Sequence, residues 1–135
     1  MNLLEFIDNV SKKNYLCLSI FILLFSGAAC EYKSKLPDPL QAGWKGQSVC
    51  EVLQENASIR VLRCTFPPGV GHEVHEHAPH FGYALIGGTF RIIDSEGTRE
   101  VSFPSGYYFS KKEVTEHEVQ NIGDSTAVFL IFEAK

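Results

Sequence analysis

From residue 46 onward, the chain is divided into short runs that favour β-structure, each ended by a turn sequence such as Pro67-Pro68-Gly69 or Gly87-Gly88. Short strands at regular spacing are typical of a β-sandwich or β-barrel. The same pattern fits a jelly roll and an immunoglobulin-like sandwich, so it predicts an all-β domain without choosing between them. We expect strands over residues 47–54, 58–66, 70–77, 81–86, 89–94, 99–103, 106–110, 115–121 and 126–133.

The N-terminal thirty residues have the features of an export signal. Lys12 and Lys13 precede an apolar run over residues 15–25, which is shorter than a membrane-spanning helix. The run ends in Gly27-Ala28-Ala29-Cys30, which resembles a bacterial lipobox. The resemblance implies that Cys30 is lipidated and anchors the protein to a membrane of the cell envelope, facing the periplasm or the surface. An uncleaved anchor, or a plain cleavage site beside an incidental cysteine, remains an alternative.

The remaining chain divides into a linker and one small domain. Residues 31–46 contain two prolines and two glycines without a regular period, so we expect a tether there, with Trp44 folding back over the bottom of the domain. Residues 47–135 are long enough for one compact core. The net charge of −4 and the lack of a long basic run argue against a nucleic-acid partner.

Three histidines, His75, His77 and His80, fall within six positions. If residues 73–77 are extended, His75 and His77 project from the same face, because side chains alternate along a strand. Ala78-Pro79 then breaks the strand, and His80 opens the next apolar run. Neutral imidazoles that converge in this way suit zinc, copper, nickel or ferrous iron better than calcium or magnesium.

The histidine stretch and a second one downstream resemble the paired motifs of the cupin superfamily. In the first motif, Gly69 is followed after five residues by His75-x-His77, after two more by His80, and after six more by Gly87. His80 stands where cupins usually carry Glu or Gln. The second motif keeps the family spacing but has lysine and valine in place of the usual proline and glycine; it consists of Gly106, Lys112, Val114, His117 and Asn121.

The resemblance covers residues 60–133 and implies a double-stranded β-helix, the jelly-roll barrel of the RmlC-like small cupins. It also implies that His75, His77 and His117 bind a divalent metal, with His80 as a fourth ligand. The alternative for His80 is a role as acid, base or hydrogen-bond donor to a bound substrate. Iron, nickel or manganese would keep exchangeable positions, whereas zinc with four histidines would be closed. A homodimer is a further implication of the family.

Other positions near the histidines follow from strand parity. Glu73 shares parity with His75 and is a candidate base beside the ligands, or else a solvated charge at the strand end. His72 has the opposite parity, so we expect it to face outward. Asn121 is expected to pin a turn. On the strand that His80 opens, one face carries residues that would leave a pocket beside the metal, namely Gly82, Ala84 and Ile86.

Two cysteines, Cys50 and Cys64, lie in the expected domain. A hairpin register that pairs Val52 with Leu62 places Cys50 opposite Cys64, and export would expose them to oxidising conditions. The sequence leaves a cross-strand disulfide and two unpaired buried cysteines both open.

Two functions remain open. The first is an enzyme, a dioxygenase-type oxidoreductase or an isomerase or lyase, acting on a small anionic or enolisable molecule. The second is a non-catalytic, metal-containing module that binds or senses a small ligand at the cell envelope.

Overall fold

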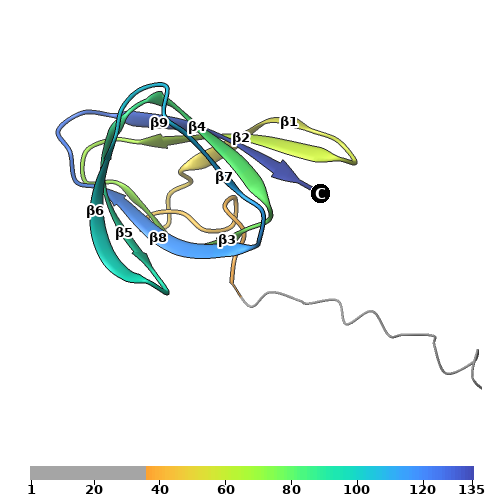
Figure 1. Cartoon of the computed structure of the whole chain (residues 1–135), viewed down its shortest axis with the longest axis horizontal. Helices are drawn as coiled ribbons and strands as arrows, with labels where there is room; N and C mark the ends of the chain where they lie inside the picture. The colour runs from red at the N-terminus through yellow and green to blue at the C-terminus, as the bar shows by residue number, and fades with distance from the viewer. Residues whose placement is uncertain (1–35) are drawn as a thin grey trace, which may run out of the picture. The chain divides into compact units, whose positions relative to one another are not determined.

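Residues 36–135, the part that the computed structural model describes, contain nine β-strands (Figure 1). Each of the nine expected runs overlaps with one of these strands, with ends that differ by up to three residues. The export signal and Cys30 lie outside the described residues. The strands are β1 (Cys50–Glu55), β2 (Ile59–Phe66), β3 (Gly71–His77), β4 (His80–Ile86), β5 (Gly88–Asp94), β6 (Gly97–Phe103), β7 (Tyr108–Lys111), β8 (Thr115–Asn121) and β9 (Ala127–Ala134).

The strands form two antiparallel sheets, which confirms the predicted fold class. One sheet has the order β1-β2-β9-β4-β7 and the other β3-β8-β5-β6. Figure 1 shows the two sheets facing each other around a common interior. Neighbours in a sheet are mostly distant in sequence, so residues from β3, β4, β8 and β9 reach the same interior.

The inward side chains divide the interior into an aromatic part and a histidine part. Phe66 and Phe90 meet edge to face with ring centroids 5.3 Å apart, and Phe90 meets Phe129 at 5.6 Å. Each such buried ring contributes about 1.5–3 kcal/mol relative to an exposed one. The ring centroid of Phe66 also lies 6.4 Å from that of His72, the first of the buried imidazoles. The apolar core therefore borders directly on the histidines.

The segment before β1 packs against the barrel. Gly43 accepts a hydrogen bond from the Glu73 amide at 2.8 Å, and Pro37 accepts one from the Glu76 amide at 3.0 Å. These bonds cover the free edge of β3, which is an outer strand of its sheet. The expected tether is therefore wrong for residues 36–46. Trp44 packs against the core and lies on Gly71, as predicted.

The first hairpin has the predicted register. Val52 pairs with Leu62 and Cys50 with Cys64. The structure joins the two cysteines by a disulfide, with their Cα atoms 4.0 Å apart. Within residues 36–135, no helix is long and apolar enough to cross a membrane.

Candidate metal centre

Three histidines from two neighbouring strands converge in the interior. His75 and His77 come from β3 and His117 from β8, and the β3–β8 register places His75 directly opposite His117. One nitrogen from each ring lies within 4.8 Å of the other two. Three imidazoles that converge from one sheet are a common ligand set for a transition metal that keeps open positions. The arrangement is consistent with a bound metal ion.

Hydrogen bonds on the far side of the His75 and His77 rings set the direction of the free nitrogen in each. Nδ1 of His75 lies 2.7 Å from the Glu73 carbonyl oxygen, and Nδ1 of His77 lies 2.7 Å from Oε1 of Glu133. Both partners are acceptors, so each Nδ1 carries the proton and donates it. Nε2 of each ring is then left with a lone pair, which is the form that binds a metal.

The free nitrogens of His75 and His77 face each other, and Nε2 to Nε2 is 2.9 Å. Two lone pairs at this distance repel each other unless a cation lies between them. Two nitrogens bound to one metal at about 2.1 Å and at right angles to each other would lie about 3.0 Å apart. The pair therefore fits a shared metal ion.

Burial keeps these rings uncharged. Burial, reinforced by the neighbouring imidazoles, lowers the pKa of His77 from 6.5 to about 2 and the pKa of His117 well below its usual value. Burial also lowers the pKa of His75. Because a metal binds the neutral imidazole, the ligands need lose no proton at neutral pH.

His80 is buried but lies beside the three-histidine group rather than within it. Its ring centroid is 4.7 Å from that of His77, and its Nδ1 donates to the Ala78 carbonyl at 2.8 Å. Nε2 of His80 therefore also carries a lone pair. This placement supports the alternative role of His80, a proton acceptor or donor next to the metal, over the expected fourth ligand.

The expectation that His72 faces outward is wrong. His72 is 2% exposed, its ring stacks on that of His75 at 3.8 Å, and its Nε2 donates to the Pro39 carbonyl at 2.9 Å. The cause is an irregular pairing between β3 and β8, where the register shifts between His72 and His75. The extra residue of a bulge reverses the alternation of faces.

The same bulge turns Glu73 away from the histidines. Its side chain is exposed and accepts a hydrogen bond from the Lys45 amide at 2.9 Å. The interpretation of Glu73 as a base beside the ligands is therefore wrong, and the alternative of a strand-end charge fits. Glu73 still contributes to the centre through its backbone, since its carbonyl fixes the ring of His75.

Glu133 of β9 is the carboxylate that the sequence reasoning missed. It is 1% exposed and holds His77 through Oε1, while Oε2 accepts from Arg60 at 2.6 and 2.8 Å. A signal for it was present in the sequence. The buried residues of β9 alternate as Ala127, Phe129 and Ile131, and this alternation places Glu133 on the inner face.

Of the three residues expected to line a pocket, two are buried and one is exposed. Gly82 and Ala84 are buried, but the Phe109 ring lies against Gly82, and a Cβ at Gly82 would overlap with it. Ile86 is 49% exposed, because the β4–β9 pairing is irregular between Ala84 and Ile86. The assignment of Ile86 to the pocket is therefore wrong.

Asn121, the last residue of the second motif, pins a turn as predicted. It is fully buried, and its amide donates to the carbonyls of Phe66 and Ser125, both at 2.8 Å. Its side-chain oxygen accepts from the Gly123 amide at 2.9 Å. The side chain ties the end of β8 to β2 and to the turn before β9, and it does not contact the histidines in the described residues.

Solved structures of other proteins share this architecture. A cupin domain from Bordetella pertussis Tohama I matches 76% of this chain and 99% of its own length, with 25% identity and a TM-score of 0.61. The cupin domain of Schizosaccharomyces pombe Cnp3 matches 64% of this chain and 59% of its own, with 15% identity and a TM-score of 0.50. The chain therefore contains a small domain with the cupin fold. No family model and no curated protein matches the sequence.

Replacing His77 tests the metal centre. We expect His77→Ala to lose metal, because it removes one of the three grouped nitrogens and leaves Glu133 without its imidazole partner. His80→Ala should retain most of the metal, because His80 lies outside the group. Elemental analysis of both variants, purified without a histidine tag, checks this. Normal metal content in His77→Ala would refute the assignment of a metal site to these histidines.

The stability of the metal-free protein should fall in acid. Burial lowers the pKa of His72 from 6.5 to about 4 in the folded state. Below pH 6.5 the unfolded chain therefore binds the proton first, and stability is lost as the pH falls. His72 alone should account for a loss of about 1.5 kcal/mol in the free energy of unfolding between pH 6.5 and 5. Urea unfolding of chelator-treated protein measures it, and a His72→Gln variant with an equally steep pH dependence would contradict the assignment.

Proposed function

We propose that this protein is a metal-dependent enzyme of the dioxygenase type that acts on a small anionic or enolisable molecule. The observation that carries the proposal is the all-nitrogen ligand set of His75, His77 and His117, in which hydrogen bonds direct the lone pairs of His75 and His77. Three protein ligands leave coordination positions for a substrate. A ferrous, nickel or manganese ion bound there would supply Lewis-acid polarisation and redox capacity.

The charges around the site support an anionic ligand. The buried carboxylate of Glu133 contacts His77 on the side away from the grouped nitrogens and is also paired with Arg60. A divalent ion would therefore keep most of its positive charge, which favours anionic oxygen in the open positions. Lys111 stands directly opposite His80 in the β4–β7 register, so both side chains leave that sheet on the same face. The ammonium group of Lys111 therefore adds positive charge near His80.

Two further residues have defined parts in the proposed site. Nε2 of His80 carries a lone pair and is placed to accept a proton from a bound molecule. The ring of Phe109 meets the His80 ring edge to face at 5.8 Å and covers Gly82. This ring occupies space beside His80, so the substrate should be small.

The alternative is a non-catalytic, metal-containing module that binds a small ligand. The position of Phe109 favours it, since the ring fills part of the space that we expected to hold a substrate. The two functions differ in turnover and in the metal that each requires.

Metal analysis combined with oxygen uptake tests the proposal. We expect protein purified without chelators to contain iron, nickel or manganese and to consume oxygen with a panel of small carboxylates and enolisable diketones. His80→Ala should lower turnover while it keeps metal, because the variant loses a proton acceptor and no ligand. Stoichiometric zinc, no oxygen uptake and saturable binding of a panel member would favour the binding module instead.

We also propose that the protein is a lipoprotein of the cell envelope, attached through Cys30. The lipobox-like sequence before Cys30 supports this location. The disulfide between Cys50 and Cys64 supports it as well, since such bonds persist in oxidising compartments.

Replacing the proposed lipidation site tests the location. Cys30→Ser should move the protein from the membrane fraction to the soluble fraction, because the lipid is the expected attachment. Fractionation followed by immunoblotting measures it, with Cys17→Ser as the matched control that should stay membrane-bound. An unchanged distribution of Cys30→Ser would refute lipid attachment at Cys30.

A further inference from the structure

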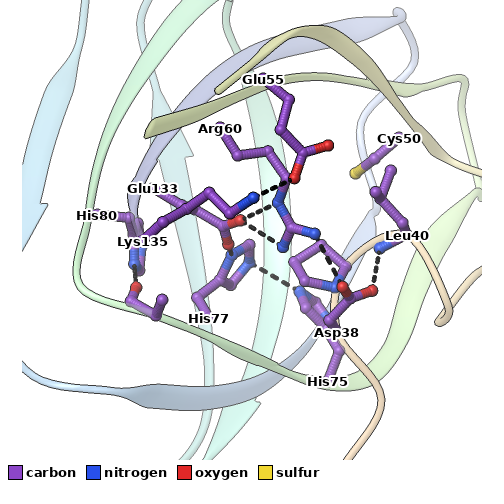
Figure 2. A network of polar contacts seen from close by, with 12 residues as sticks. Asp38, Leu40, Cys50, Glu55, Arg60, His75, His77, His80, Glu133 and Lys135 are labelled. Carbon is purple, nitrogen blue, oxygen red and sulfur yellow. Dashed lines mark hydrogen bonds and ion pairs between the residues drawn. The ribbon is translucent and has the colours of Figure 1, made fainter. Parts of the chain in front are cut away.

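A continuous chain of hydrogen bonds runs from Asp38, in the segment before β1, to the metal centre (Figure 2). Asp38 accepts a hydrogen bond from Nη1 of Arg60 at 2.8 Å. Arg60 donates from Nε and Nη2 to Oε2 of Glu133, at 2.8 and 2.6 Å. Oε1 of Glu133 in turn accepts a hydrogen bond from Nδ1 of His77 at 2.7 Å. Each side-chain oxygen of Glu133 thus has its own partner.

The burial of Glu133 makes a purely stabilising role a poor explanation. The side chain is 1% exposed, and taking a carboxylate and a guanidinium out of water costs several kcal/mol per ion. An apolar residue of similar size at the same place is often as stable or more so. The other buried side chains of β9 are apolar, so position 133 departs from its own strand. The departure occurs where the strand meets a metal-binding histidine.

We infer that Glu133 is a positioning residue for His77, held in place by Arg60 and, through it, by Asp38. The carboxylate keeps the proton on Nδ1, keeps the ring from turning, and makes Nε2 more basic, as partners behind metal-bound histidines generally do. The inference rests on the metal binding of the proposed function and extends it to residues that touch neither metal nor substrate.

The same segment before β1 also supports His75, through His72. The Pro39 carbonyl holds His72 by a hydrogen bond of 2.9 Å, and the His72 ring stacks on His75. Asp38 and Pro39 are adjacent in sequence, so one short segment helps to position both His77 and His75. The geometry thus makes residues 38–39 part of the metal centre, although they lie far from β3 in sequence.

Replacing Glu133 by glutamine tests the inference. The amide has one acceptor oxygen and a donor NH₂, so it faces either His77 or Arg60 with a donor against a donor. We expect Glu133→Gln to bind Zn²⁺ about 10- to 100-fold more weakly than the wild type in competition with a chromophoric chelator. At saturating Co²⁺, its visible absorption spectrum should also differ from that of the wild type.

A matched control is available on the outside of the same sheet. Glu51 accepts from Nε and Nη2 of Arg63 at 2.9 and 2.7 Å, the same type of pair as Arg60 and Glu133, but exposed. Glu51→Gln should leave Zn²⁺ affinity and the Co²⁺ spectrum unchanged. An equal loss of affinity in Glu51→Gln would attribute the effect to general destabilisation and overturn the inference.

A second variant keeps the test valid if Glu133→Gln fails to fold. Asp38→Ala removes a partner of Arg60 without changing His77 or Glu133, and its affinity for Zn²⁺ should lie below that of the wild type. Wild-type affinity in Glu133→Gln, or in Asp38→Ala where that variant replaces it, would overturn the inference and leave the proposed function intact. If the wild type itself binds neither Zn²⁺ nor Co²⁺, the proposed function fails.

Discussion

The burial of several uncharged imidazoles side by side is the constraint on which this structure depends. His72, His75, His77 and His80 are buried in the barrel, and burial lowers the pKa of each. Buried imidazoles need a hydrogen-bond partner for the ring proton, and all four have one, at the carbonyls of Pro39, Glu73 and Ala78 and at the carboxylate of Glu133. The remaining nitrogens of His75 and His77 face each other as lone pairs, an arrangement that a cation stabilises.

The rest of the barrel supports this arrangement. The aromatic part around Phe66, Phe90 and Phe129 provides the apolar burial that a small domain needs. The disulfide ties β1 to β2, and the segment before β1 covers the edge of β3. A strand with a free edge would hold its histidines less firmly than one whose amides are paired on both sides. The segment before the first strand is therefore a structural part of the barrel.

The errors in assigning side chains to the two faces of a strand have one physical origin. Parity along a strand is reliable only while the pairing is regular, and the pairing is irregular after His72 and after Ala84. At each place the face assignments changed, which buried His72, turned out Glu73 and exposed Ile86. The hydrogen bonds that cause such irregularities come from other strands, so a local pattern does not reveal them. Glu133 was accessible to the same reasoning, because β9 alternates without interruption.

The resemblance to cupins paired the His-x-His motif with His117. The sequence alone was enough to predict the all-β class and the nine strand segments, and it allowed a register that pairs Cys50 with Cys64. These features depend on local propensity, turn residues and spacing, which are written along the chain. Tertiary structure decided which side chains meet: that His80 stands beside the group, that His72 joins it, and that Asp38, Arg60 and Glu133 lie behind His77. The reason is that the order of the strands in the sheets brings together residues that are far apart in the chain. The spacing of residues in the sequence does not show this order.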